Sequence, residues 1–248
     1  MHATARPVAL ITGSARRIGA TIARSLHAAG FDLALHCRNS RVELDALIEE
    51  LETTRAGSTL ALQADLADIG SLPGLITDTV RRFGRLDGLV NNASGFGPTP
   101  LDSITPAQWD ELFASNARAP LFLAQAAATH LAASGGAIVN LDDIHGERPL
   151  REHTVYCMAK AALLMATRSL ALELAPRVRV NAVSPGAILW PQDSSDVAAQ
   201  AAMLARTPLG RTGTPEEVAE AVRWLLQDAT YCTGQVLHLD GGRLLDSQ

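Results

Sequence analysis

The chain has 248 residues and a single lysine, Lys160, although lysine and arginine together number 21. A general replacement of lysine by arginine, at positions where any positive charge suffices, would explain the low lysine content. Arginine is a planar fork that stays protonated, whereas lysine is a compact ammonium whose pKa shifts on burial. A position that keeps lysine is therefore a candidate for a task that needs those properties. Tyr156 lies four residues earlier, and this spacing places both side chains on one face of a helix.

The sequence is also poor in cysteine and in aromatic residues, and it lacks long basic or apolar runs. Its three cysteines are odd in number and far apart, without metal spacing, so we expect a reduced, cytoplasmic protein and no metal site. The net charge is −5 and no Lys/Arg run exceeds two residues, so we expect no nucleic-acid partner. No uninterrupted apolar stretch reaches the roughly 18 residues that span a bilayer. The first residues also lack the apolar region of a signal peptide, so no membrane partner is expected.

Short β-rich runs alternate with longer helical patterns, which is typical of a parallel sheet covered on both faces. The predicted fold class is α/β: a doubly wound, Rossmann-like parallel sheet of about seven strands with helices on both faces, in one domain over residues 1–248. Strands are expected at 7–12, 32–36, 59–63, 86–91, 137–141, 179–183 and 235–239. Helices are expected at 17–29, 41–55, 71–83, 106–131, 154–174 and 215–227. Residues 185–207 are the least regular stretch, either a loop that covers a ligand or a surface excursion.

A glycine-containing turn joins the first strand to the first helix, with the sequence Thr12-Gly13-Ser14-Ala15-Arg16-Arg17-Ile18-Gly19. Glycines at such a turn let the backbone approach a pyrophosphate, and the helix amides attract its charge. A tight turn that simply needs glycine is the alternative, because the spacing differs from the usual dinucleotide fingerprint. The cofactor contacts predicted here are Gly13, Arg16, Arg17, Ile18 and Gly19.

The end of the second strand indicates which dinucleotide would bind. NAD sites usually place Asp or Glu there, against a ribose hydroxyl. Here the strand runs into His36-Cys37-Arg38-Asn39-Ser40, without an acid. Arg38, Asn39 and Ser40, with Arg17, would suit a 2′-phosphate, so we predict NADPH as the cofactor. A solvated surface arginine is the alternative for Arg38.

Polar residues follow the later strands, where ligands of doubly wound folds bind. They are Asp65-Leu66, Asn91-Asn92-Ala93-Ser94, Asp142-Asp143 and Ser184-Pro185-Gly186. Asn116 lies inside a predicted helix, where asparagine is a poor helix former. Any one of them could be a turn or cap residue. Their placement on one rim of the sheet is what indicates a site.

In this order and spacing, the motifs resemble the short-chain dehydrogenase/reductase family over nearly the whole chain. The resemblance includes Tyr156-x-x-x-Lys160, Asn116 and the closing Asp240-Gly241-Gly242. It implies hydride transfer from a nicotinamide, with Tyr156 as the acid, Lys160 lowering the phenol's pKa and binding the ribose, and Asn116 holding a water. The further cofactor contacts that it implies are Asp65, Leu66, Asn92, Ala93, Ser94, Tyr156, Lys160, Pro185 and Gly186.

Two residues depart from the common family pattern. Arg17 replaces a glycine of the phosphate loop, and Asp143 replaces the catalytic serine that lies thirteen residues before the tyrosine. A serine hydroxyl donates to the oxygen that gains negative charge in ketone reduction, whereas a carboxylate would repel that oxygen and raise the phenol's pKa. Asp143 therefore favours a substrate that gains a proton on nitrogen, such as a C=N bond in a heterocycle.

Both departures match the pteridine reductases, which the chain also resembles in Asn92-Ala93-Ser94-Gly95-Phe96. This resemblance implies that Phe96 stacks on a flat pterin, and loop packing is the alternative. The substrate contacts would be Arg17, Ser94, Phe96, Asp143 and Tyr156, and the catalytic residues Asp143, Tyr156, Lys160 and Asn116. The predicted function is NADPH-dependent reduction of a dihydropterin or dihydrofolate-type substrate.

Two other functions stay open. An NADPH-dependent carbonyl reductase, such as the 3-oxoacyl-carrier-protein type, is disfavoured by Asp143. A non-catalytic dinucleotide-binding sensor is disfavoured because both Tyr156 and Lys160 are present. Family analogy implies a homotetramer. Three residues between Asp143 and Tyr156 are interpreted as solvated loop residues outside the site: His145, Arg148 and His153.

Overall fold

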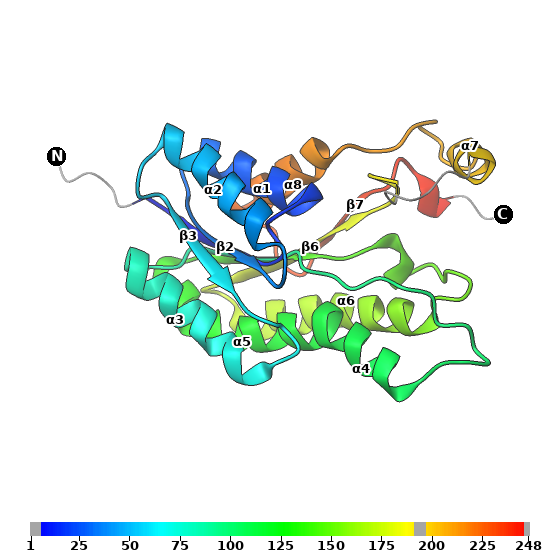
Figure 1. The fold of residues 1–248 in the computed structure, drawn as a ribbon, viewed down its shortest axis with the longest axis horizontal. Helices are drawn as coiled ribbons and strands as arrows, with labels where there is room; N and C mark the ends of the chain where they lie inside the picture. The colour runs from blue at the N-terminus through cyan, green and yellow to red at the C-terminus, as the bar shows by residue number, and fades with distance from the viewer. Residues whose placement is uncertain (1–5, 191–196, 246–248) are drawn as a thin grey trace.

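The computed structural model describes residues 6–190 and 197–245, and a seven-stranded parallel sheet forms its centre (Figure 1). The strands are β1 (Val8–Ile11), β2 (Asp32–Cys37), β3 (Thr59–Gln63), β4 (Gly88–Asn91), β5 (Ala137–Leu141), β6 (Arg179–Pro185) and β7 (Val236–Leu239). Their order across the sheet is β3-β2-β1-β4-β5-β6-β7, so β1 pairs with both β2 and β4. The predicted fold class and the predicted number of strands are confirmed.

Helices cover both faces of the sheet, because each parallel connection needs a crossover. One face carries α1 (Arg17–Ala28), α2 (Arg41–Thr54) and α8 (Pro215–Gln227), and the other carries α3 (Leu72–Phe83), α5 (Ala119–Ser134) and α6 (Thr154–Leu174). Two further helices, α4 (Pro106–Phe113) and α7 (Val197–Ala205), lie toward the edge at which the strands end (Figure 1). Short helical turns are η1 (Ile69–Ser71), η2 (Ala114–Arg118), η3 (Ile144–Gly146) and η4 (Arg243–Leu245).

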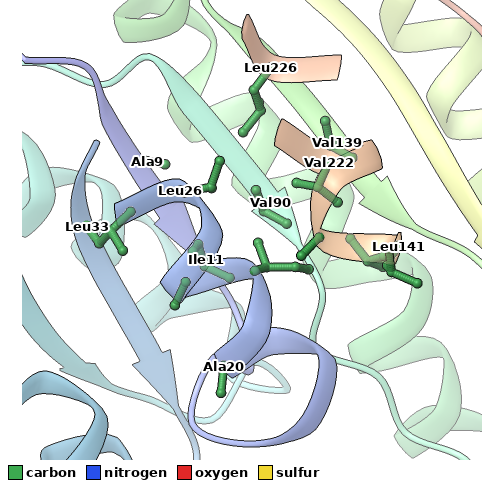
Figure 2. Close-up of a cluster of buried hydrophobic side chains, with 14 of the residues drawn as sticks. Ala9, Ile11, Ala20, Leu26, Leu33, Val90, Val139, Leu141, Val222 and Leu226 are labelled. Carbon is green, nitrogen blue, oxygen red and sulfur yellow. The ribbon is translucent and has the colours of Figure 1, made fainter. Parts of the chain in front are cut away.

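Two apolar layers hold these helices on the sheet. In the first, Ile11, Leu33 and Val90 from the strands meet Leu26 of α1 and Val222 of α8, and all five are fully buried (Figure 2). Burying each such side chain contributes about 1.5–3 kcal/mol. A second layer packs α3, α5 and α6 against the opposite face. These two layers fix the strands in place, and with them the positions of the residues at their carboxyl ends.

One predicted helix is wrong in its extent. Residues 106–131 were expected to form a single helix, but the structure divides them into α4, the π-helical turn η2 and α5. The Ala119 amide donates to the Ala114 carbonyl, five residues back, in this turn. Pro120 supplies the reason, because it lacks the N–H that an α-helix would direct to the carbonyl of Asn116. The π-turn holds Asn116 against the site, as such turns often do.

The prediction of an irregular stretch over residues 185–207 is also corrected. β6 continues to Pro185, and α7 occupies Val197–Ala205. Residues 191–196 within that stretch lie outside the described part of the chain. The sequence of α7 is almost entirely apolar and Ala-rich, so it lacks the helical spacing of polar and apolar residues by which an amphipathic helix is recognised.

By length and composition, α6 is the one helix in residues 6–190 and 197–245 that is apolar enough to cross a membrane. It packs against β6 and the π-turn, and it buries Lys160 and Thr167. These contacts are those of a core helix in a globular fold.

Candidate active site

Two adjoining cavities open at the carboxyl ends of the strands, where β1 lies beside β4 and the chain reverses the direction in which it builds the sheet. This is where doubly wound folds bind ligands. The larger cavity, of about 610 Å³, is lined by Gly13, Ala15, Arg16, Arg17, Ile18, Gly19, His36, Cys37, Arg38, Asn39, Ser40, Asp65, Leu66, Ala67, Asn92, Ala93, Ser94, Gly95, Glu111, Ala114 and Ser115. The smaller, of about 200 Å³, is lined by Arg17, Ile18, Asn92, Ser94, Leu141, Asp142, Asp143, Tyr156, Lys160, Pro185, Gly186, Ile188 and Leu189. Every cofactor contact predicted from the sequence lines one cavity or both.

The turn between β1 and α1 is fixed to the end of β4. Gly13 has φ +62°, and a Cβ there would lie 2.9 Å from the Cα of Ala93, so glycine is required for both reasons. The Thr12 hydroxyl accepts hydrogen bonds of 3.0 Å from the amides of Asn92 and Ala93. The Asn92 side chain donates to the carbonyls of Thr12 and Gly13, each at 2.9 Å. The first residues of α1 therefore line the larger cavity, and the turn before them is held in place by β4. A pyrophosphate binds to the backbone amides at such a helix start.

His36 supports this loop from below and was not among the predicted site residues. The Gly13 amide donates to its Nδ1 at 3.3 Å, and its Nε2 lies 3.1 Å from the Ala64 carbonyl. Burial lowers the pKa of His36, so the neutral ring with the proton on Nε2 satisfies both contacts. Its position near the end of β2, the strand that pairs with β1, is the signal that could have found it.

The far end of the larger cavity carries a cation and no carboxylate on β2. Arg38 is exposed there, and its guanidinium has no ion pair with a described residue. Asp65, at the end of β3, accepts a hydrogen bond of 2.9 Å from the Ala67 amide. One cavity thus joins the start of α1, which suits a pyrophosphate, to the ends of β2 and β3, which suit the adenosine part of a dinucleotide. Arg38 would suit a phosphate on that adenosine part.

Tyr156 and Lys160 lie on one face of α6, as their spacing predicts. The Lys160 Nζ is 5.8 Å from the centre of the Tyr156 ring and donates a hydrogen bond of 2.9 Å to the Leu141 carbonyl. Only 2% of Lys160 is exposed. Burial lowers the pKa of Lys160, and the charges of Asp142 and Asp143 act in the opposite direction. The chain's single lysine is thus a buried amine in the wall of the smaller cavity.

Asp143 controls the state of the tyrosine. The Tyr156 hydroxyl donates to Asp143 Oδ2 at 2.8 Å, and the His145 amide donates to Oδ1 at 2.9 Å. Burial raises the pKa of Tyr156, and the charge of Asp143 raises it further. The effect expected from Lys160, a lower phenol pKa, does not prevail. Tyr156 is therefore a neutral phenol whose proton points at a carboxylate.

The π-turn completes the opposite wall. Asn116, which is 1% exposed, donates to the carbonyls of Gly95 and Leu112 at 2.8 and 2.9 Å, and its Oδ1 accepts from the Ser94 hydroxyl at 2.6 Å. Phe96 follows directly and is 61% exposed. Its ring meets Tyr156 edge-on, with the centroids 4.9 Å apart. One face of this ring stacks on His153, and the exposed remainder of Phe96 is available to a planar ligand.

His145, Arg148 and His153, interpreted as solvated loop residues, are partly exposed and line neither cavity, but His145 and His153 contact residues of the candidate site. His153 stacks on Phe96 with ring centroids 4.7 Å apart. His145 bonds to Asp143 through its amide, and its Nδ1 lies 3.0 Å from the Arg148 carbonyl. The short helical turn η3 begins directly after Asp143, whose side chain accepts from the His145 amide.

Asp142 is a second carboxyl group in the cavity wall that sequence reasoning left out of the site. It is 5% exposed, and neither of its oxygens has a hydrogen-bond partner in the described part of the chain. Burial raises its pKa to about 7, although the charge of Lys160 opposes the rise. A carboxyl group so placed destabilises the fold when it is ionised.

Replacing Asp142 with asparagine is expected to change the pH dependence of stability. Because the folded pKa is raised, the stability that this carboxyl contributes is complete below about pH 4 and is lost as the pH rises through about 7. The free energy of unfolding of Asp142→Asn, relative to wild type, should therefore increase by roughly 2–3 kcal/mol between about pH 5 and pH 8. Urea unfolding at both pH values measures this. Asp102→Asn, at an exposed position, is the matched control, and a difference that does not vary with pH would refute the assignment.

A doubly wound sheet with a glycine-containing turn after β1 and a Tyr/Lys pair on α6, beside the end of β5, is typical of a nicotinamide-dependent oxidoreductase. Residues 13–243 match the family model described as enoyl-(acyl carrier protein) reductase. The chain belongs to the short-chain dehydrogenase/reductase family.

Several relatives are similar to this chain to nearly the same degree. Pteridine reductase 1 of Leishmania tarentolae is 38% identical over 278 residues, covering 95% of this chain and 96% of the relative. Ketoacyl reductase 2 of the granaticin polyketide synthase from Streptomyces violaceoruber is 40% identical over 245 residues, covering 95% of each. The 3-oxoacyl-[acyl-carrier-protein] reductase FabG of Staphylococcus aureus is 35% identical over 240 residues, covering 94% and 96%. Overall identity does not separate these activities, so the residues of the site must.

Proposed function

We propose that this protein is an NADPH-dependent pteridine reductase that acts on dihydropterin or dihydrofolate-type substrates. The observation that carries the proposal is the hydrogen bond of 2.8 Å from Tyr156 to Asp143. A hydroxyl donor at position 143 would serve a ketone, whereas a carboxylate accepts the N–H groups of a heterocycle and stabilises positive charge on it. The exposed ring of Phe96, edge-on to Tyr156, would stack on the same heterocycle.

The cofactor is assigned to the larger cavity. Gly13, Ile18 and Gly19 would hold the pyrophosphate at the start of α1, and Arg38 with Ser40 the 2′-phosphate. Lys160, beside Tyr156, would bind the nicotinamide ribose. When bound, NADPH supplies the hydride that a ring carbon of the substrate accepts.

The chain's own residues account for the proton. Tyr156 is protonated, and its hydroxyl is oriented by Asp143, so it is ready to donate to the ring nitrogen beside the reduced carbon of an oxidised pterin. Lys160 stabilises the phenolate that remains until solvent restores the proton. For a dihydropterin the proton comes from water, which Asn116 and Ser94 would position.

Carbonyl reduction is the second candidate, because the ketoacyl reductases named above are as similar in sequence as the pteridine reductase. The charge of Asp143 opposes the alkoxide that forms on a reduced ketone. A sensor without activity is a third candidate, and the complete Tyr156–Asp143–Lys160 arrangement argues against it. We further propose a cytoplasmic homotetramer, since apolar side chains stay exposed along α5 and α6: Leu121, Met158, Met165 and Leu172.

A substrate panel followed by NADPH oxidation tests the proposal. We expect turnover with dihydrobiopterin, dihydromonapterin or dihydrofolate, and at least about tenfold less with 3-oxoacyl thioesters, which corresponds to about 1.4 kcal/mol in the barrier. NADH in place of NADPH should give a KM for the cofactor that is at least about tenfold higher. Turnover of thioesters without turnover of any pterin would favour carbonyl reduction. NADPH binding without turnover of either would favour the sensor.

A further inference from the structure

Asp142 is a buried carboxyl group of the site that no hydrogen bond satisfies. It stands directly after β5 and lines the smaller cavity together with Tyr156 and Lys160. Only 5% of Asp142 is exposed, and neither carboxyl oxygen has a hydrogen-bond partner within residues 6–190 and 197–245. A buried carboxylate without partners is unfavourable unless a positive charge lies near it. The carboxylate form of Asp142 therefore depends on a cation in its surroundings.

The backbone directs this carboxyl group to the face of the sheet that α6 covers. The Asp142 amide donates to the Val183 carbonyl at 2.8 Å, so the pairing of β5 with β6 continues through this residue. Side chains two residues apart on a strand point to the same face. Asn140 points to α6, because its Nδ2 donates to the Thr167 hydroxyl at 2.8 Å. Asp142 therefore points toward α6 as well.

Two sets of distances place Asp142 beside Lys160 of α6. The Lys160 Nζ donates at 2.9 Å to the Leu141 carbonyl, which belongs to the peptide group that joins Leu141 to Asp142. A Cβ added at Gly146 would lie 2.9 Å from Asp142 Oδ2 and 3.2 Å from the Lys160 carbonyl carbon. The carboxyl group and the turn of α6 that carries Lys160 therefore flank the same point beside Gly146. Charges that are this close inside a protein interact more strongly than they would in water.

The other acids near Lys160 are already engaged by donors. Titratable side chains on the segments packed around Asp142 come from α6, from η3 and its end, and from the same loop: Tyr156, Lys160, His145, Glu147 and Asp143. Asp143 accepts from Tyr156 and from a backbone amide, at 2.8 and 2.9 Å. Glu147 pairs with a histidine of β7 at 3.1 Å. Asp142 has neither kind of partner, so its charge is available to Lys160.

Electrostatics agree with this placement. Burial lowers the pKa of Lys160, and the charge of Asp142 opposes this more than the charge of Asp143 does. Burial raises the pKa of Asp142 to about 7, and the charge of Lys160 opposes that rise. Each of the two groups therefore stabilises the charged form of the other.

We propose that Asp142 is a positioning residue whose carboxylate is the counter-charge that holds the Lys160 side chain in its ammonium form inside the fold. The inference rests on the proposed function and deepens it, because Lys160 must be charged to stabilise the phenolate that Tyr156 becomes once it has given its proton to the substrate. The carboxyl oxygens of Asp142 are shielded from the cavity, so they act through Lys160 and not on the substrate.

The single lysine makes this pair directly measurable by NMR. Protein grown with lysine that is isotopically labelled at Cε carries one labelled side chain, that of Lys160, and its chemical shift changes when the ammonium loses its proton. In Asp142→Asn this change should occur at a lower pH than in wild type, because the counter-charge is lost. The wild-type signal should also report the ionisation of Asp142, whose pKa is raised to about 7, and Asp142→Asn should lack this step.

Two further variants control the titration. Asp142→Glu keeps the charge and should hold the lysine transition closer to the wild-type pH than Asp142→Asn does. Asp102→Asn removes an exposed carboxylate and should leave the transition where it is in wild type. Circular dichroism at each pH shows that folded protein is being measured. The inference is overturned if Lys160 loses its proton at the same pH in wild type and in Asp142→Asn.

Kinetics test the consequence for the reaction. At a pH where Lys160 is neutral in Asp142→Asn but charged in wild type, kcat for the proposed pteridine substrate should be about tenfold or more lower in the variant. The charge of Asp142 also raises the pKa of Tyr156, so phenolate formation is followed separately by ultraviolet absorbance. A wild-type kcat under these conditions would overturn the role of Asp142 in the reaction. The NMR titration needs no substrate, so a failure to turn over any pteridine would refute the proposed function alone.

Discussion

Lys160→Arg is expected to lower kcat for the proposed pteridine substrate by about 10²-fold or more, within the range over which acid–base groups contribute to catalysis. Lys160 is 2% exposed, and its ammonium fits between the Tyr156 ring and the Leu141 carbonyl. The guanidinium fork is larger and planar, so it cannot occupy this space without displacing its neighbours. The charge would remain, but its distance from the phenol and the ribose would change.

Two measurements separate this effect from simple misfolding. The far-ultraviolet circular dichroism of Lys160→Arg should match wild type, and overpacking should lower the free energy of unfolding by about 1–3 kcal/mol. Arg177→Lys exchanges the same two residue types at an exposed position and should leave kcat unchanged. Near-wild-type kcat in Lys160→Arg would mean that the single lysine reflects composition alone.

Asp143→Ser is expected to exchange one activity for another. Turnover of the pteridine should fall about 10- to 100-fold, because the accepting carboxylate that orients Tyr156 is lost. Reduction of a 3-oxoacyl thioester should rise above the wild-type level, because a hydroxyl can donate to the developing alkoxide.

The same substitution should move the pH profile. The charge of Asp143 raises the pKa of Tyr156, so its removal lowers that pKa. The alkaline limb of kcat, where the phenol loses its proton, should shift to lower pH. Asp143→Asn has the same size without the charge and should give the same shift. An unchanged alkaline limb in both variants would contradict the assignment of Tyr156 as the acid.

Much of the fold was predictable because it depends on local patterns. Alternating strand and helix patterns gave seven strands in a parallel sheet, with boundaries that mostly agree within about two residues. The prediction of one helix over 106–131 failed because Pro120 lacks the N–H that an α-helix would direct to the Asn116 carbonyl, and the helix divides there. The short α7 is almost entirely apolar, so its sequence shows no helical spacing of polar and apolar residues.

The site was predictable to the extent that it lies at strand ends. Parallel strands bring their carboxyl ends to one edge, so Gly13, Asn92, Asp143 and Gly186 had to lie near one another once the sheet was known. The lysine of α6 joined them through its spacing from Tyr156. Residues whose role depends on packing were missed, since nothing in the sequence says which polar group will be buried without a partner.

The sequence by itself determined the fold class and which residues stand at the strand ends of the candidate site, including the aspartate at the position where the family usually has a serine. Only the tertiary structure decided how the charges combine: that the phenol's pKa rises rather than falls, and that Asp142 is buried in the same cavity wall as the lone lysine. Motifs follow from neighbours along the chain. Electrostatic energies follow instead from burial and from distances between segments that meet only in the folded protein.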